Sequence, residues 1–268
     1  MKTKIKKNIN PLVSIIMNCH NGEKYLKDSL KSVINQNYKN WELIFFDNQS
    51  DDNSIKIVKE FDDHRIKNFS SNKLLNLYAA RNFAINKAKG KYICFCDTDD
   101  WWIKNKLEKQ IKLIKKLKKI KIIFSNLYFY YQKTKKRKLY FNKMKSLGNF
   151  TQELLNDYKL GILTVMVDKS IFKKNKFNKK FNIIGDFDFF LNLSLKEEFY
   201  CSKEPLAYYR VHEHNYSKNL KLYAKELKYW ISKNYNKFNN KNYSLKKIKF
   251  YLHKIRLKNF FLGAIAHW

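Results

Sequence analysis

Leu12-Val-Ser-Ile-Ile-Met17 is a short, almost uninterrupted run of apolar residues that ends shortly before the turn residues Asn21 and Gly22. Such a run, rich in β-branched residues, is typical of a strand in a parallel sheet that is covered on both faces. The next segment has apolar residues three to four positions apart, as a helix requires, and a second apolar run follows at residues 41–46. Strand, helix and strand in succession predict a parallel β-α-β unit.

The same alternation continues to residue 96. A helix over residues 54–61 and a short strand over residues 66–69 come next. An alanine-rich helix then stops at Gly90, because glycine is a common residue at helix ends, and a fourth strand follows at residues 91–96. We therefore expect an α/β fold with a mostly parallel sheet.

Beyond residue 102 the pattern changes. The predicted elements, in chain order, are a basic helix at 105–118, a β hairpin formed by 122–130 and 138–141, a helix at 151–157, an extended segment at 163–167, a helix at 186–195 and an extended segment at 207–211. The chain from 220 to 268 is rich in lysine and aromatic residues with helical spacing. We expect one domain over residues 1–219 and a basic C-terminal helical extension over residues 220–268.

The chain has 268 residues, of which 44% are hydrophobic, so it can bury a core and is not a disordered polycation. It lacks the run of about 18 apolar residues that a membrane-spanning helix needs. Residues 12–19 are too short and too strand-like for a signal sequence, which predicts a cytoplasmic protein. The four cysteines contain no CxxC pair, and we expect buried free thiols rather than zinc ligands or disulfides.

Lysine and arginine number 56 against 23 aspartates and glutamates, a formal net charge of +33. Such an excess attracts polyanions, among them nucleic acids, anionic lipids and phosphorylated substrates. Alternatively, the lysines only reflect a biased composition on a solvated surface, since the chain is also rich in Asn, Ile, Phe and Tyr. The charge alone leaves both interpretations open.

Asp97-Thr-Asp-Asp-Trp-Trp102 directly follows the fourth predicted strand. In open α/β sheets, ligands bind beyond the carboxyl ends of the strands. Neighbouring carboxylates repel one another unless a cation or protons offset them, and their oxygens suit Mg²⁺ or Mn²⁺ that is also bound to phosphate. We favour a metal–phosphate site over the alternative, a solvated acidic turn.

Polar residues also follow the first two strands, as Asn18-Cys-His-Asn21 and Asp47-Asn-Gln-Ser-Asp51. Either segment alone would more often be ordinary turn chemistry. Together with the acidic segment they predict a nucleotide pocket, in which amide and carboxylate groups contact a base or ribose and His20 stacks on the base.

These segments resemble the family 2 glycosyltransferases, which have the GT-A fold. The matching motifs are Val13-Ser-Ile-Ile-Met-Asn-Cys-His-Asn-Gly-Glu-Lys-Tyr-Leu26, Asp47-Asn-Gln-Ser-Asp-Asp-Asn-Ser54, Ala80-Arg-Asn82 and Asp97-Thr-Asp-Asp-x-Trp102. The resemblance covers about residues 11–215. It implies an inverting enzyme with a GT-A catalytic domain over residues 1–219, a nucleotide-diphosphate sugar as donor, and Mn²⁺ or Mg²⁺ as cofactor.

The resemblance also implies roles for individual residues. The implied nucleotide-binding residues are Asn18, His20, Asn21, Glu23, Asp47, Asn48, Arg81 and Asp97. Asp99 would coordinate the metal, and Asp100 would share either task. Asn18, His20 and Asn48 differ from the residues more common in the family. Because Asn48 still offers both an acceptor and a donor to a uracil or thymine edge, we favour a UDP-sugar.

Asp186 and Asp188 lie at the start of the helix predicted at 186–195. Their segment resembles the family's Glu-Asp motif, in which the residue matching Asp186 is the catalytic base, while Gly185 replaces the usual Glu. A carboxylate base of this kind typically contributes about 10²–10⁴ in rate. The alternative is helix capping, which we favour for Asp188, with an accessory role in the site left open.

Tyr209-Arg-Val-His-Glu-His214 resembles the family's Arg-x-His element. His212 would bind the cation or the pyrophosphate, and Arg210 would neutralise the pyrophosphate. A structural role is an equal alternative for His212 and the more common one for His214. Trp102 is an accessory candidate that would stack on an acceptor sugar, although we expect one of the two adjacent tryptophans to pack in the core.

The helices expected over residues 220–268 combine aromatic residues with many lysines. A pair of such helices can lie on an anionic membrane surface, where each lysine contributes about 1 kcal/mol. This arrangement would suit an enzyme whose acceptor is linked to a lipid. The alternative, equally weighted, is a helical cap on the catalytic domain with a solvated basic face.

We expect a cytoplasmic glycosyltransferase, with a peripheral position on the inner face of the cell membrane left open. It would transfer a sugar from a UDP-sugar to a saccharide or lipid-linked acceptor in surface polysaccharide, lipooligosaccharide or glycolipid synthesis. Two alternatives are a basic nucleic-acid-binding module without catalysis and a nucleotidyltransferase on a similar sheet. The acidic clusters oppose a nucleic-acid partner, and the glycine-rich phosphate loop of the second alternative is missing.

Overall fold

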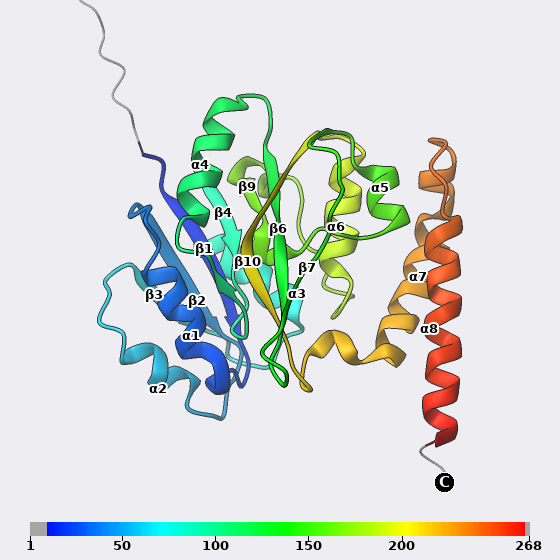
Figure 1. Cartoon of the computed structure of the whole chain (residues 1–268). Helices are drawn as coiled ribbons and strands as arrows, with labels where there is room; N and C mark the ends of the chain where they lie inside the picture. The colour runs from blue at the N-terminus through cyan, green and yellow to red at the C-terminus, as the bar shows by residue number, and fades with distance from the viewer. Residues whose placement is uncertain (1–9, 266–268) are drawn as a thin grey trace, which may run out of the picture.

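The computed structural model describes residues 10–265, with side chains up to residue 259. The strands are β1 (Val13–Cys19), β2 (Trp41–Asp47), β3 (Ile66–Ser70), β4 (Tyr92–Phe95), β5 (Trp101–Trp102), β6 (Ile122–Tyr131), β7 (Arg137–Leu139), β8 (Leu147–Gly148), β9 (Met166–Asp168) and β10 (Phe199–Val211). They form one sheet in the order β3-β2-β1-β4-β9-β6-β10-β5, with β7 beside β6 and β8 beside β10 (Figure 1).

The sheet is mixed, and most of its long pairings are parallel. β3, β2, β1 and β4 run parallel to one another, as do β6 and β10. β9 is antiparallel to both of its neighbours, β4 and β6, and so joins the two parallel halves. The α/β fold with a mostly parallel sheet that the sequence predicts is therefore confirmed.

Helices cover both faces of the sheet. The helices are α1 (Glu23–Ile34), α2 (Ser54–Lys59), α3 (Leu77–Lys87), α4 (Lys106–Lys116), α5 (Thr151–Asn156), α6 (Gly185–Ser194), α7 (Leu220–Asn239) and α8 (Lys246–Ile265). α1, α2 and α4 contribute to one hydrophobic core, and α3, α5, α6, α7 and α8 to the other. Successive β1 residues alternate between them: Ile15 and Met17 belong to the first core and Ile16 to the second, because strand side chains point alternately to opposite faces.

The carboxyl ends of three strands meet at one edge of the sheet. Cys19 at the end of β1 is paired with Asp47 at the end of β2, and the Cys96 N–H after β4 donates to the Ile16 carbonyl of β1 at 3.0 Å. In the sheet, β2 and β3 lie on one side of β1, and β4 lies on its other side. This reversal of strand order is where open α/β sheets bind ligands.

One expected element is confirmed and others differ from the sequence-based expectation. The expected hairpin is present as β6 and β7, which pair antiparallel. The segment 163–167 was expected to be extended, but residues Ile162–Thr164 form a 3-10 helix and only Met166–Asp168 form a strand. β5 was not predicted, because a run of two tryptophans is too short to show the alternation typical of a strand. It is a strand only because the fold brings it beside β10, with which it pairs antiparallel.

The helices predicted near the C-terminus are present as α7 and α8, while residues 266–268 lie outside the described part. The two helices pack against each other beside α5 and α6 (Figure 1). Trp230 and Phe238 of α7 are fully buried in the core that also contains α6. All four cysteines are free and buried, as expected. Among the described residues, no helix is both long enough and apolar enough to cross a membrane.

Candidate functional site

A cavity of about 1360 Å³ opens at the carboxyl ends of β1, β2 and β4. Its wall brings together most of the residues that the sequence singles out. These are Asn18, His20, Asn21, Asn48, Arg81, Asp97, Asp99, Asp100, Asp186, His212 and His214. Segments separated by more than a hundred residues in the chain therefore share one cavity.

Five other candidates do not line this cavity: Glu23, Asp47, Asp188, Arg210 and Trp102. The Glu23 carboxylate accepts hydrogen bonds from the Asn53 backbone N–H at 2.9 Å and side-chain Nδ2 at 2.8 Å. It fixes the loop before α2 from a position outside the cavity wall. The Asp47 side chain is buried, and its Oδ2 accepts from the Ser50 N–H at 3.2 Å. Both residues shape the loops around the cavity. Oδ1 of Asp47 is buried without a hydrogen-bond partner in the described part of the chain, and the nucleotide contacts expected of Glu23 and Asp47 stay predictions.

Trp102 and Asp188 are structural. Trp102 is buried, and its Nε1–H donates to the Leu163 carbonyl at 2.9 Å. It cannot stack on an acceptor sugar, which corrects that expectation. Asp188 accepts a hydrogen bond at 2.9 Å from Nε1 of Trp230 on α7. It therefore joins α6 to α7 and, within the described residues, makes no capping hydrogen bond at the start of α6, so its structural role differs from the helix capping expected for it.

The side-chain amide of Asn48 is turned toward the loop before α3. Its Oδ1 accepts from the Leu75 N–H at 3.0 Å, and its Nδ2 donates to the Leu75 carbonyl at 2.8 Å. Ser71 Oγ donates to the same Oδ1 at 3.2 Å. Asn48 lines the cavity, but both of its polar atoms are occupied by the loop. In this arrangement the amide fixes the loop before α3, and its expected contact with a base edge stays a prediction.

Arg81 and Asp97 form an ion pair inside the cavity, with 2.8 Å between Nη2 and Oδ1. The Arg81 side chain is 2% exposed, whereas that of Asp97 is 35% exposed and faces the cavity. The position deep in the protein raises the pKa of Asp97, and Asp99 adds to this, while Arg81 opposes it. The Arg81 guanidinium is therefore the main group that favours the ionised form of this carboxylate.

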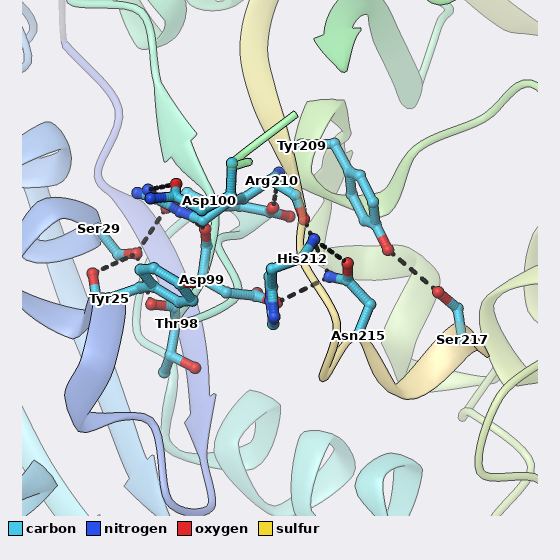
Figure 2. A network of polar contacts seen from close by, with 11 residues as sticks. Tyr25, Ser29, Thr98, Asp99, Asp100, Tyr209, Arg210, His212, Asn215 and Ser217 are labelled. Carbon is cyan, nitrogen blue, oxygen red and sulfur yellow. Dashed lines mark hydrogen bonds and ion pairs between the residues drawn. The ribbon is translucent and has the colours of Figure 1, made fainter. Parts of the chain in front are cut away.

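Asp99 and His212 lie side by side at the next position along the cavity wall. Nε2 of His212 is 2.9 Å from Oδ2 of Asp99, and Nδ2 of Asn215 donates to the same oxygen at 3.3 Å. The Tyr25 ring packs on the imidazole with 4.9 Å between ring centroids. Figure 2 shows Asp99 from the loop after β4 converging with His212 and Asn215 from the loop after β10, with Tyr25 of α1 beside them.

This pair fits a divalent cation in part. A carboxylate oxygen and an imidazole nitrogen at this separation can bind one Mn²⁺ or Mg²⁺ together, and Nδ1 of His212 is buried without a hydrogen-bond partner in the described part of the chain. No group of three or more His, Cys, Asp and Glu among residues 10–265 is placed to hold an ion alone. A cation here would need further ligands, which the phosphates of a nucleotide supply in many sites of this kind.

Arg210 clamps the acidic segment in place rather than facing the cavity. Its Nε donates to the Asp99 carbonyl at 2.8 Å, and its Nη2 forms an ion pair with Asp28 on α1 at 2.9 Å. The guanidinium lies between the rings of Tyr25 and Trp101, 4.3 and 4.5 Å from their centroids. Arg210 thus holds the acidic segment in place (Figure 2), and its expected neutralisation of a pyrophosphate stays a prediction.

Asp100 completes this clamp. Its side chain is 1% exposed, and its Oδ1 accepts from the Arg210 backbone N–H at 2.9 Å. Burial raises the pKa of Asp100 well above the usual range, and the neighbouring Asp99 and Asp97 add to the effect. Ser29 Oγ contacts the carbonyls of Thr98 and Asp100 at 2.7 and 2.6 Å. Asp100 therefore holds the turn so that Asp97 and Asp99 point into the cavity.

Asp186 lines the same cavity from the first turn of α6. Its Oδ1 accepts from the Tyr78 hydroxyl at 3.1 Å and from the Phe187 N–H at 2.8 Å. Burial raises the pKa of Asp186, whereas the hydrogen bonds and Arg81 lower it. A carboxylate with a raised pKa is a stronger base, and its second oxygen is free of the hydrogen bonds that hold the first.

The Tyr78 ring also explains the departure at Gly185. A Cβ added to Gly185 would lie 2.4 Å from ring atoms of Tyr78. The tyrosine thus occupies the space that a side chain at position 185 would need. Tyr78 was missed by reasoning from the sequence, because its only signal is its place three residues before Arg81 on the same helix.

Further tyrosines in the cavity wall were missed for the same reason. They include Tyr140, Tyr158, Tyr209, Tyr223 and Tyr251. With 18 tyrosines in the chain, composition cannot single out those that face one cavity.

Residues 14–183 match the family model described as "Glycosyl transferase family 2". The chain is 34% identical over 212 residues to the Escherichia coli protein named UDP-Glc:alpha-D-GlcNAc-diphosphoundecaprenol beta-1,3-glucosyltransferase WfgD, covering 73% of this chain and 78% of that protein. It is 33% identical over 223 residues to an uncharacterized glycosyltransferase of Methanocaldococcus jannaschii, covering 79% and 75% of the two chains.

Solved structures show the same fold. S. aureus TarS 1-349 in complex with UDP superposes with a TM-score of 0.60 at 19% identity, over 80% of this chain and 65% of that one. The mannosyltransferase PcManGT from Pyrobaculum calidifontis, in complex with GDP-Man and Mn2+, gives 0.62 at 14% identity, over 82% and 63%. The chain thus spans about two thirds of these structures, and the expected GT-A fold is confirmed. By its matched residues and its relatives, the chain belongs to glycosyl transferase family 2.

Proposed function

We propose that this protein transfers a sugar from a UDP-sugar to a saccharide linked through a diphosphate to a lipid, with inversion at the anomeric carbon. The observation that carries the proposal is that one cavity is lined both by the strand-end residues Asp97 and Asp99 and by the partly buried carboxylate of Asp186. A donor held at the first two residues would present its sugar to an acceptor held near the third.

The donor side is supported by the residues after β1 and β4. Asn18 and His20 line the cavity at the end of β1, where we expect the base, and the amide of Asn18 is buried without a hydrogen-bond partner in the described part of the chain. Asp97, which Arg81 holds through an ion pair, would contact the ribose or the donor sugar. UDP is the favoured nucleotide because WfgD is named for UDP-Glc and TarS was solved with UDP.

Asp99 and His212 are the residues that would hold a divalent cation, Mn²⁺ or Mg²⁺. When bound, such an ion neutralises the charge that develops on the leaving diphosphate. Asn215 and Arg210 keep the pair oriented through the contacts described above. The family resemblance and the Mn2+ in the PcManGT structure support this assignment.

Asp186 would act as the base. As the acceptor hydroxyl oxygen bonds to the anomeric carbon, its proton moves to the free oxygen of Asp186, and the bond between that carbon and the β-phosphate oxygen breaks to release UDP. Attack on the face opposite the leaving group inverts the anomeric configuration. Tyr78 orients the carboxylate through its hydrogen bond to Oδ1.

The acceptor class follows from the relatives and from the C-terminal surface. WfgD is named for a diphosphoundecaprenol acceptor, which resides in a membrane. Phe250, Lys254, Leu257 and Lys258 are exposed, and their spacing places them on one face of α8. We propose that this face contacts the anionic inner surface of the membrane and brings the cavity to its acceptor.

The test is transfer by the purified protein to α-D-GlcNAc-diphosphoundecaprenol from UDP-Glc and other UDP-sugars, with Mn²⁺ or Mg²⁺. We expect Asp186→Asn to lower transfer by about 10²–10⁴-fold while UDP binding persists. Asp99→Asn should weaken UDP binding with Mn²⁺ but not without it. The proposal would be abandoned if no UDP-sugar bound or reacted, or if Asp186→Asn transferred at the normal rate.

A further inference from the structure

Beyond Asp186 the cavity continues between α5, α6, α7 and α8. We call this part the tyrosine arm, and its wall contains Tyr140, Tyr158, Tyr223 and Tyr251, with Leu154 and Ile248. Two of the tyrosines come from the C-terminal helices, and the others come from the loops after β7 and α5. The arm therefore exists only because α7 and α8 pack on the rest of the protein.

The aromatic rings of the arm stand at steep angles to one another. The rings of Tyr223 and Tyr251 are 6.1 Å apart at 83°, and Tyr158 meets Phe187, the neighbour of Asp186, at 5.2 Å and 73°. The Tyr140 hydroxyl donates to the Tyr158 carbonyl at 2.7 Å, which fixes that loop. These contacts hold the rings as fixed walls.

The Tyr158 hydroxyl is a second feature of the tyrosine arm, independent of the packing of its rings. Its oxygen is buried and has no hydrogen-bond partner in the described part of the chain. A buried polar group of this kind costs free energy unless a ligand or water satisfies it. Burial and the nearby Asp186 both raise the pKa of Tyr158, so the group is a neutral hydroxyl that can donate or accept.

We propose that the tyrosine arm is the binding site for the acceptor saccharide, an inference that rests on the proposed function. A pyranose ring has an apolar C–H face and a rim of hydroxyls, which match a wall of aromatic rings and an unpaired tyrosine hydroxyl. The arm begins at Asp186, so a saccharide in it presents a hydroxyl to the base. Tyr251 stacks on the sugar, and Tyr158 hydrogen-bonds to its rim.

The experiment measures separate KM values for donor and acceptor, using UDP-Glc and α-D-GlcNAc-diphosphoundecaprenol, together with hydrolysis of UDP-Glc without acceptor. Tyr251→Ala should raise the acceptor KM about tenfold, against a change of less than about twofold in the donor KM. Tyr158→Phe removes only the hydroxyl and should raise the acceptor KM about threefold or more. Tyr251 is 49% exposed, so its replacement leaves the fold intact.

The matched control is Tyr235→Ala, which removes a tyrosine of α7 that is 38% exposed and lies outside the cavity wall. It should leave both KM values within twofold of wild type. A rise in the donor KM of Tyr251→Ala would show that the arm holds the donor sugar and would overturn the inference. Unchanged acceptor KM values in both tyrosine variants, with wild-type transfer intact, would also overturn it. If the wild-type protein neither bound nor hydrolysed UDP-Glc, that result would instead contradict the proposed function itself.

Discussion

Single residues around the cavity show how local environment sets chemistry. Asp97, Asp100 and Asp186 are all carboxylates, yet Asp97 pairs with an arginine, Asp100 meets a backbone N–H in the core, and Asp186 meets a tyrosine hydroxyl. Burial raises the pKa of each, and all three line the cavity, but the Asp100 side chain is almost fully buried whereas Asp97 and Asp186 are partly exposed. Position and partner, rather than residue type, therefore separate the three functions.

Tyr78→Phe tests this view of Asp186. The Tyr78 hydroxyl lowers the pKa of Asp186, so its removal should raise that pKa further. A base must be ionised to accept a proton, so activity is lost as the pH falls through the pKa of Asp186. We expect the acid limb of the kcat/KM profile to move to higher pH in the variant, with loss of rate at neutral pH. An unshifted profile would mean that Asp186 is not the titrating base.

At the scale of elements, close contacts between helices and loops place the site residues. α6 approaches α3 so closely that Gly185 touches the Tyr78 ring. The turn after β4 is held by Ser29 of α1 and by Arg210 of β10. The first contact sets the position of Tyr78 beside Asp186, and the second determines where Asp97 and Asp99 point.

Gly185→Ala should destabilise the protein by about 1–3 kcal/mol, because the new methyl group overlaps the Tyr78 ring and one of the two helices must shift. Urea unfolding measures this loss. The same substitution in a Tyr78→Leu background should cost clearly less, since the smaller side chain leaves room. An equal cost in both backgrounds would mean that the ring contact is not the cause.

At the scale of the whole molecule, the C-terminal helices share a core with the sheet. Trp230 and Phe238 are fully buried among residues of α6, and the Trp230 indole donates to Asp188. The division into residues 1–219 and 220–268 remains a prediction, and these contacts indicate that the two parts unfold together.

Trp230→Phe should lower the free energy of unfolding by about 2–4 kcal/mol, because it leaves a cavity and removes one of the hydrogen bonds to buried Asp188. Urea unfolding followed by circular dichroism should show one transition with a lower midpoint. The control is Tyr229→Phe, a change at the adjacent and partly exposed position. A separate early transition confined to the helical signal would instead favour an independent C-terminal domain.

The exposed face of α8 predicts binding to anionic membranes. Phe250 is 59% exposed and Leu257 45% exposed, with Lys254 and Lys258 beside them. We expect the protein to float with phosphatidylglycerol vesicles at low salt and less so at high salt. Phe250→Ser should weaken binding about three- to tenfold, whereas Phe83→Ser on α3, where the phenylalanine is 52% exposed, should not. Equal flotation with neutral phosphatidylcholine vesicles would contradict the electrostatic part of this prediction.

Sequence alone determined the α/β fold and the edge of the sheet that carries the site. Residues 12–17 and 41–46 form buried strands because their apolar runs match the period of a covered parallel sheet, and parallel strands bring their carboxyl ends together. Asp97, Asp99 and Asp186 could be named in advance because their motifs are local. Only the tertiary structure decided that Arg210 is a clamp, that Asn48 holds a loop and that four tyrosines line the arm beyond Asp186. The physical reason is that hydrogen-bond partners and cavity walls come from segments far apart in the chain, whose approach depends on the packing of the whole core.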